Sequence, residues 1–148
     1  MTVYAEGPVE SPGFLLWRVT LRWQRLMTEA LRPLDLTHVQ FVLLASTWWL
    51  GHDGQTPHQL TIAAHAGTNI KMTSEVLRKL EDKGLVTQSP DARDRRARAV
   101  SVTGLGARLA ERGIAVVEKA DAEFFAVVPV SIVPALRLLA SLDTMPQE

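Results

Sequence analysis

The stretch from Ile62 to Val102 constrains the fold most, because helix signals and strand signals follow one another there at short distances. A short helical segment ends near Gly67, and a tight turn leads into a second helix that Gly84 stops. This second helix is predicted to bury an apolar stripe at helical spacing, Met72, Val76, Leu77 and Leu80. Two runs with strand character, 85–88 and 100–102, enclose the turn-rich segment SPDARDRRAR. Helix, turn, helix and hairpin in this order predict a winged helix-turn-helix.

Helical patterns also precede this unit. Residues 14–31 carry two apolar stripes, which predict two buried faces, and Pro33 ends that helix because it lacks an amide hydrogen. A second helix is predicted from Thr37 to about Leu50, with a capping box between Thr37 and Gln40. The sequence predicts the same device for the short third helix, with Thr56 as its N-cap.

Two further helices are predicted after the hairpin. A long apolar pattern begins at Thr103 and extends to about Val127. A last helix is expected from Ser131 to Leu142, which accommodates Pro134 because proline is tolerated in a first turn. Together with 14–31, these helices hold more apolar surface than a small winged domain can cover, which predicts an interface with a second copy of the chain.

Composition excludes several classes of protein. The chain has 148 residues, 47% of them hydrophobic and none of them cysteine. It is therefore expected to be one compact unit without disulfides or thiolate metal sites. The longest apolar run, 41–45, is far shorter than a membrane span, so a soluble cytoplasmic protein is expected. Because no phosphate loop, nucleophile motif or metalloprotease motif is present, neither enzymatic activity nor a cofactor is predicted.

The charges are unevenly distributed, although 16 basic and 16 acidic residues give a net charge of zero. The segment from Lys71 to Arg98 contains eight basic and five acidic residues, so half of all positive charge lies in less than a fifth of the chain. In a winged helix this segment forms the elements that approach DNA, and the acidic excess lies on the other helices. The charge distribution therefore favours double-stranded DNA as a partner.

The dimensions of the DNA grooves assign roles within this segment. A helix fits the major groove, and Lys71, Thr73 and Ser74 are the residues best placed to reach base edges, while Arg78 is expected at phosphate. An arginine on the hairpin tip can enter the minor groove, and Asp94 is placed to orient Arg96. The predicted DNA-binding residues are Asn69, Lys71, Thr73, Ser74, Arg78, Arg93, Asp94, Arg95 and Arg96.

Two less specific interpretations stay open. The tip DARDRRAR is also what a purely solvated charge run looks like. A winged helix can also serve as a protein-interaction module that binds no DNA. The basic bias of the segment Lys71 to Arg98 favours DNA, because a protein-binding module does not need it.

Three motifs, in this order and spacing, resemble the MarR family of winged-helix transcriptional regulators. They are the helix end LEDKGLV (80–86), the wing sequence DRR (94–96) and the start of the long helix VTGLG (102–106). The resemblance covers the helix order from about Phe14 to Leu142. It implies a homodimer that reads a pseudo-palindromic operator, probing the major groove with the helix from about Asn69 to Lys83 and the minor groove with the Ser89–Arg98 wing. Carried over by position, Asp94 and Arg96 match the family's wing pair.

The predicted fold is accordingly mainly α with a small β-hairpin wing (α+β), a winged helix-turn-helix with N- and C-terminal dimerisation helices. Residues 1–13 are expected to form a flexible arm, 14–36 and 104–148 the dimerisation region, and 37–103 the DNA-binding domain. The sequence departs from the family at Val102, where leucine is usual. Gly104 and Gly106 are predicted to weaken the first turn of the long helix by roughly 1 kcal/mol each relative to alanine.

Many MarR regulators bind a small aromatic or anionic effector between the dimer helices and the winged domain. An arginine beside aromatic walls suits a carboxylate or phenolate. The candidates are Trp17, Arg18, Arg22, His38, Phe41, Trp48 and Trp49. Adjacent Trp48 and Trp49 differ by about 100° around a helix, so one can be buried while the other lines a cleft. The alternative is that these tryptophans pack at an interface and that the arginines are surface residues.

The four histidines suggest a metal site at first sight. His58 and His65 are seven residues apart, so they can share a helical face. No cysteine is available, however, and no carboxylate lies at the third or fourth position after either of them. We therefore predict structural or solvent-exposed histidines and no metal site.

Overall fold

The computed structural model describes residues 3–94 and 97–141. The elements are η1 (Gly7–Glu10), α1 (Pro12–Leu31), η2 (Arg32–Leu34), α2 (His38–Leu50), α3 (Gln59–Ala66), α4 (Ile70–Asp82), β1 (Val86–Pro90), β2 (Arg98–Val102), α5 (Gly104–Phe125) and α6 (Val133–Ala140). The two strands form an antiparallel hairpin in which Val86 pairs with Val102 and Pro90 with Arg98. The predicted fold class, mainly helical with a hairpin wing, is confirmed.

Side-chain caps define where most of the helices begin. At α2 both hydrogen bonds of the predicted capping box are present, each 3.2 Å long, between Thr37 and Gln40. Asn69 caps α4 and Thr103 caps α5 in the same manner, each accepting a bond from a backbone amide of the first turn. These short polar side chains satisfy amides that have no partner within the helix.

The predicted start of the third helix is wrong. Helix α3 begins at Gln59 with His58 at its N-cap, and no side chain of the described residues caps it. Residues 57 and 58, which precede this helix, pair with strand β2 instead. The amide of Val100 donates to the carbonyl of Pro57 (2.9 Å), and His58 forms an isolated β-bridge with Ala99. Because this pairing requires extended backbone, Thr56 does not take the N-cap position.

The helix bounds differ from the prediction at both ends of the chain. Helix α1 begins at Pro12, and a 3-10 turn at Gly7–Glu10 precedes it. As predicted, α1 stops before Pro33, at Leu31, and Pro134 occupies the first turn of the last helix. Helices α5 and α6 are shorter than predicted, ending at Phe125 and Ala140.

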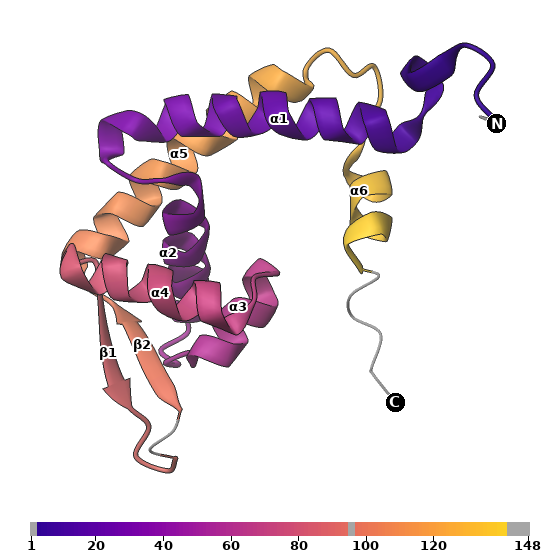
Figure 1. Cartoon of the computed structure of the whole chain (residues 1–148). Coiled ribbons are helices and arrows are strands. Elements are labelled where there is room, and N and C mark those ends of the chain that lie inside the picture. Colours follow the sequence, from indigo (N-terminus) through magenta and orange to yellow (C-terminus); the bar gives the residue numbers. More distant parts are fainter. Residues whose placement is uncertain (1–2, 95–96, 142–148) are drawn as a thin grey trace.

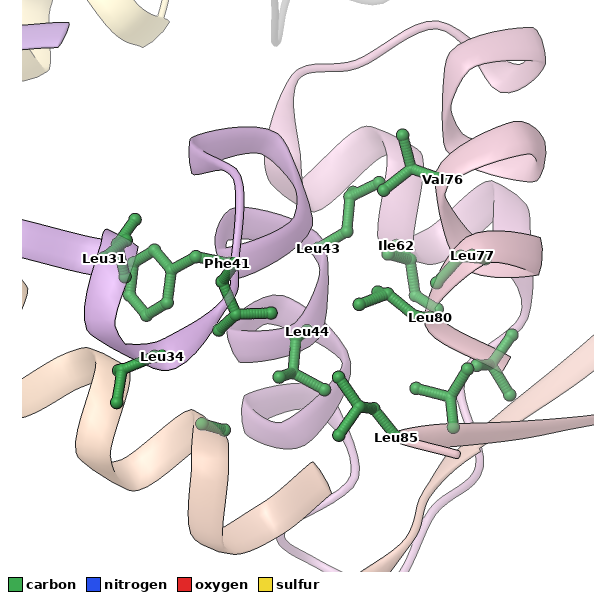
Figure 2. Packing of buried hydrophobic residues seen from close by; sticks show 14 residues of the cluster. Leu31, Leu34, Phe41, Leu43, Leu44, Ile62, Val76, Leu77, Leu80 and Leu85 are labelled. Carbon is green, nitrogen blue, oxygen red and sulfur yellow. The ribbon is translucent and has the colours of Figure 1, made fainter. Parts of the chain in front are cut away.

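Helix α2 lies at the centre of the hydrophobic core. Leu43 and Leu44 are fully buried there, between α3 and α4 on one side and the end of α1 and α5 on the other (Figure 2). Val86 and Val100 anchor the base of the wing to the same cluster. The core therefore connects the helix-turn-helix and the wing into one packed unit.

Helix α5 reaches this core through a close approach at Gly113. A Cβ atom added at Gly113 would lie 2.8 Å from the ring of Phe41. Phe41 itself is buried among the core residues. The absence of a side chain at Gly113 thus lets α5 pack directly on α2.

Much apolar surface stays uncovered at the end of the molecule opposite the wing. Helix α1 extends along that end and α6 stands away from the other helices (Figure 1). Every residue of α6 is exposed, and so is every residue from 12 to 19 of α1. The exposed large apolar side chains of these two helices are Phe14, Leu15, Leu16, Trp17, Val19, Val133, Leu136, Leu138 and Leu139. A surface of this kind marks an interface.

Candidate nucleic-acid interface

The first turn of α4 is fixed by a small network of polar contacts. The side chain of Asn69 accepts the amide of Met72 (2.8 Å). The hydroxyl of Thr73 donates to the carbonyl of Asn69 (2.8 Å) and lies 2.7 Å from the hydroxyl of Thr68. Thr73 has no exposed surface. The prediction that Thr73 reaches base edges is therefore wrong, because its side chain ties the turn to the helix from inside.

Met72 also differs from the prediction. It was expected in the buried stripe, but it is 42% exposed, and Thr73 takes the inward position one residue further along. The buried face of α4 thus consists of Thr73, Val76, Leu77 and Leu80. The opposite face carries the exposed residues Lys71, Ser74, Glu75, Arg78 and Lys79.

A polar hollow separates this face from the wing. Its volume is about 270 Å³, and it is lined by Gln59, Ser74, Glu75, Arg78, Glu81, Gln88 and Arg98. Ser74 and Arg78 of α4 therefore lie beside Arg98, which begins β2 at the tip end of the hairpin, on one surface. The structure brings these predicted residues of the helix and a basic residue of the wing together.

The wing is attached to the helices by its backbone and by its side chains. The side-chain amide of Gln59 donates to Gln88 (2.5 Å), and the backbone amide of Gln88 donates to the carboxylate of Glu81 (2.8 Å). Further out, the ring of His58 lies 2.5 Å from a carboxylate oxygen of Asp91. These contacts fix the direction in which the hairpin points.

Asp91 also closes the tip of the wing. Its carboxylate accepts the backbone amide of Arg93 (2.6 Å), and its own amide donates to the carbonyl of Ala97 (2.8 Å). The bond from the Arg93 amide, followed by the contact with His58, holds the pKa of the Asp91 carboxyl below its usual value. Arg93 and Asp94 are exposed at the tip. Arg95 and Arg96, and with them the predicted pairing of Asp94 with Arg96, lie outside the described residues.

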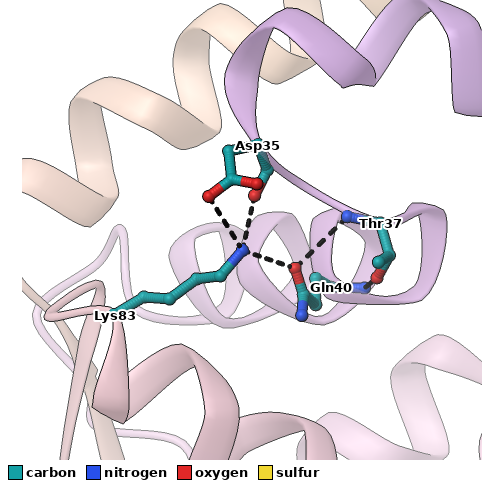
Figure 3. A network of polar contacts seen from close by, with 4 residues as sticks. All are labelled: Asp35, Thr37, Gln40 and Lys83. Carbon is teal, nitrogen blue, oxygen red and sulfur yellow. Dashed lines mark hydrogen bonds and ion pairs between the residues drawn. The ribbon is translucent and has the colours of Figure 1, made fainter.

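Lys83 connects the end of α4 to the turn between α1 and α2 (Figure 3). Its ammonium group donates to the backbone carbonyl of Asp35 (2.5 Å) and to the side chain of Gln40 (3.0 Å), and it lies 3.7 Å from the Asp35 carboxylate. Gln40 in turn accepts the amide of Thr37 as part of the capping box. The end of α4 is thereby held against the start of α2.

Replacing Lys83 with methionine is expected to lower the free energy of unfolding by about 1 kcal/mol, because hydrogen bonds to a charged group are lost while the aliphatic stem is kept. Urea denaturation measures the change. Lys79→Met is the matched control, since Lys79 is exposed on the same helix, and its expected effect is below about 0.5 kcal/mol. Equal effects of the two substitutions would contradict the role of the network.

The residues predicted to bind an effector fall into separate places. Trp17, Arg18 and Arg22 lie on exposed parts of α1. His38 is half-buried at the start of α2, where its ring packs edge-on against Trp23 with 4.9 Å between the ring centroids. The indole of Trp23 donates to the carboxylate of Asp121 on α5 (2.7 Å). Burial lowers the pKa of His38, and the charge of Asp121 partly opposes that shift.

Phe41 does not line a cleft, which makes that prediction wrong: its ring fills the space above Gly113 inside the core. The adjacent tryptophans differ in exposure, as their separation of about 100° around the helix predicts. Trp48 packs against the core, whereas Trp49 is 55% exposed and stacks on His52. Both line a cavity of about 470 Å³ together with Ala45, Ser46, His65, Ile114 and Glu118.

The sequence did not identify Trp23, Asp121, Ile114 or Glu118 as neighbours of these sites. Trp23 and Asp121 are 98 residues apart, so only the packing of α1 on α5 brings them together. Within the described ranges, no three histidine, aspartate or glutamate residues lie close enough to hold a metal ion. None of the helices in that part of the chain is long and apolar enough to cross a membrane.

A helix-turn-helix with a basic outer face, followed by a braced hairpin, defines a winged-helix DNA-binding protein. The family model of the MarR family matches residues 36–97. An uncharacterized HTH-type transcriptional regulator of Bacillus subtilis, YdcH, is 46% identical over 120 residues, which cover 81% of this chain and 82% of that protein. The HTH-type transcriptional repressor Rv2887 of Mycobacterium tuberculosis is 35% identical over 116 residues, with 77% and 79% covered.

The fold is also shared with a solved structure of CouR from Rhodococcus jostii RHA1 bound to p-coumaroyl-CoA. The TM-score is 0.78 at 23% identity, and the alignment covers 97% of this chain and 99% of that one. The chain belongs to the MarR family and is a DNA-binding transcriptional regulator. Members of this family are regulators of transcription and not enzymes.

Proposed function

We propose that this regulator is a homodimeric repressor that binds a pseudo-palindromic operator and leaves it when a small aromatic or anionic effector binds. The observation that carries the proposal is the separation of two surfaces. The uncovered apolar side chains are on α1 and α6, whereas the exposed basic residues are on α4, and Figure 1 shows α4 and the wing apart from α1 and α6. Two copies joined through the first surface present two recognition helices to DNA.

The role of a repressor is supported by the relative Rv2887, which is named as one. In the proposed complex Lys71 and Ser74 contact base edges in the major groove, with Asn69 at the entrance of the helix, and Arg78 contacts phosphate. The second set of contacts comes from the tip of the wing in the minor groove, from Arg93, Asp94, Arg95 and Arg96. In two-fold symmetric helix-turn-helix dimers, half-sites are about 34–36 Å apart.

Operator sequences selected from a random pool of duplex DNA allow these roles to be tested. Arg78→Ala is expected to weaken binding to all sequences alike and to reduce the salt dependence by about one unit, because one phosphate contact is lost. Ser74→Ala is expected to change the preferred bases, and Arg96→Ala to weaken binding without a large change in melting temperature.

Arg25→Ala serves as the control, because Arg25 is an exposed arginine of α1, away from α4 and the wing. Fluorescence anisotropy at several salt concentrations measures each variant. A chain that enriches no sequence from the pool, or an Arg78→Ala variant with the salt dependence of the Arg25→Ala control, would refute DNA recognition through α4.

The effector is proposed to bind in the cavity beside Trp48 and Trp49. This position is supported by the cavity's aromatic walls and by its location between α2, α3 and α5. A ligand bound there changes the position of the helix-turn-helix relative to α5. CouR, a protein of the same fold, is described in complex with p-coumaroyl-CoA. His65 and Glu118 supply the polar groups, with Trp17, Arg18, Arg22 and His38 as further candidates outside the cavity.

Titration with aromatic carboxylic acids tests the effector proposal through tryptophan fluorescence. A saturable change is expected, together with weaker operator binding at the same ligand concentrations. Trp49→Phe should remove most of the fluorescence change, because Trp49 lines the cavity. Trp17→Phe should leave the change intact, because Trp17 lies outside the cavity on α1. No saturable change with any such acid would contradict this part of the proposal.

A further inference from the structure

Two large apolar side chains on the DNA-facing helix are partly exposed and take no part in the contacts proposed above. Ile70 and Met72 occupy the first and third positions of α4 and are 46% and 42% exposed. Lys71 stands between them. On the exposed face of α4, whose other members are polar or charged, these two side chains are the ones able to contact an apolar group of a partner.

The orientation of both side chains is fixed by the polar network of the first turn. The inward direction of Thr73 is set by its bonds with Thr68 and Asn69, and the amide of Met72 is held by the Asn69 side chain. Successive residues of a helix are about 100° apart. Ile70 and Met72 therefore lie on either side of Lys71, at the edges of the face that points away from the core.

The apolar interface of the proposed dimer does not reach this place. The uncovered side chains belong to α1 and α6, which Figure 1 shows apart from α4 and the wing. The exposed residues of α4 nearest to Ile70 and Met72 are Lys71, Ser74 and Glu75, and Arg78 follows one turn later. The polar and charged character of these residues does not match an apolar protein partner, and the basic residues among them match the DNA backbone.

The major groove of DNA offers one apolar group, the C5-methyl group of thymine. We propose that Ile70 and Met72 are specificity-determining residues that contact thymine methyl groups on either side of the base pair read by Lys71. Lysine in this position hydrogen-bonds to O6 and N7 of guanine. Each half-site of the operator then contains a guanine with thymines next to it. The inference rests on the proposed function and adds to it the bases that the helix selects.

Substituting deoxyuridine for thymidine tests this inference directly, because it removes the methyl group and keeps every hydrogen-bonding atom of the base. In an operator selected from a random pool, each thymine of the half-sites is replaced in turn and the affinity is measured. A contacted methyl group is expected to be worth about fourfold in affinity, from the usual free energy of burying one such group. Symmetric replacement in both half-sites is expected to cost about fifteenfold, the product of two such losses.

Alanine variants assign the methyl groups to residues. The Met72→Ala variant should bind thymine and uracil equally well at the position that Met72 contacts, and it should keep the uracil penalty at the position that Ile70 contacts. The Ile70→Ala variant should show the reverse pattern. Alanine favours helix, so both variants are expected to fold. Leu60→Ala is the matched control: Leu60 is 70% exposed on α3, and its removal should leave every uracil penalty unchanged.

The outcomes distinguish this inference from the function on which it rests. If the wild-type chain binds its selected operator specifically but tolerates uracil at every position, methyl recognition is refuted and operator binding stands. Uracil penalties that are unchanged at every position in both Met72→Ala and Ile70→Ala also refute the assignment. If selection enriches no sequence at all, both the inference and operator binding fail.

Discussion

Replacing Gly106 with alanine is expected to destabilise the protein by about 3 kcal/mol or more, which is a large part of the stability of a domain of this size. A Cβ atom at this position would lie 1.9 Å from the carbonyl oxygen of Leu85 and 2.9 Å from a methyl group of Val102. The oxygen belongs to the backbone, and it already accepts bonds from the amide and the hydroxyl of Thr103. It cannot move away without breaking the junction between the hairpin and α5.

Gly104→Ala provides the control within the same helical turn. Its Cβ atom would lie 3.6 Å from the end of the flexible Arg108 side chain, which is an ordinary contact. Alanine is expected to stabilise the helix there by up to about 1 kcal/mol, as helix propensity predicts. Urea denaturation of both variants measures the two changes. Two changes of the same sign would contradict the close approach at Gly106.

Replacing Leu139 with aspartate is expected to convert the proposed dimer into a monomer and to weaken operator binding at least about 100-fold. The affinity falls because a monomer loses the second half-site, and joining two sites typically contributes a factor of this size or more. Leu139 is 61% exposed in a single chain, so its replacement is not expected to unfold one. Leu16→Asp on α1 should have the same effect, because the proposed interface includes both helices.

Sedimentation equilibrium and operator titration measure the two consequences. Leu60→Asp is the control for the oligomeric state: this leucine is also exposed, but it lies on α3, away from α1 and α6. The control should stay dimeric. A wild-type chain that sediments as a monomer at micromolar concentration, or a Leu139→Asp variant that stays dimeric, would refute the proposed interface.

The local signals in the sequence predicted the elements well. Capping at Thr37, the stop before Pro33 and the tolerance of Pro134 depend on interactions between residues only a few positions apart. The order of these elements predicted the winged-helix fold, and three sequence motifs carried the resemblance to the family. The prediction at Thr56 was wrong because the extended segment 57–58 pairs with β2, about 40 residues away, and local capping rules do not include such a contact.

The candidate site was predicted less completely, because periodicity does not determine how a helix is rotated about its axis. Thr73 and Met72 are adjacent, and a stripe of apolar residues favours burying the methionine. The bonds of Thr73 with Thr68 and Asn69 instead turn the threonine inward, which leaves Met72 at the exposed edge of α4. Similarly, the contact between Trp23 and Asp121 joins two helices that are distant in sequence.

The two glycines at the start of α5 separate what sequence and structure contribute. The sequence determined that a helix begins after Thr103 and that glycine there costs helix stability, because propensity is a property of the residue itself. It treated Gly104 and Gly106 alike. Only the tertiary structure decided that the first faces a flexible side chain and the second a backbone oxygen. The physical reason is that excluded volume depends on which distant atoms share the space, and packing, not local preference, brings them there.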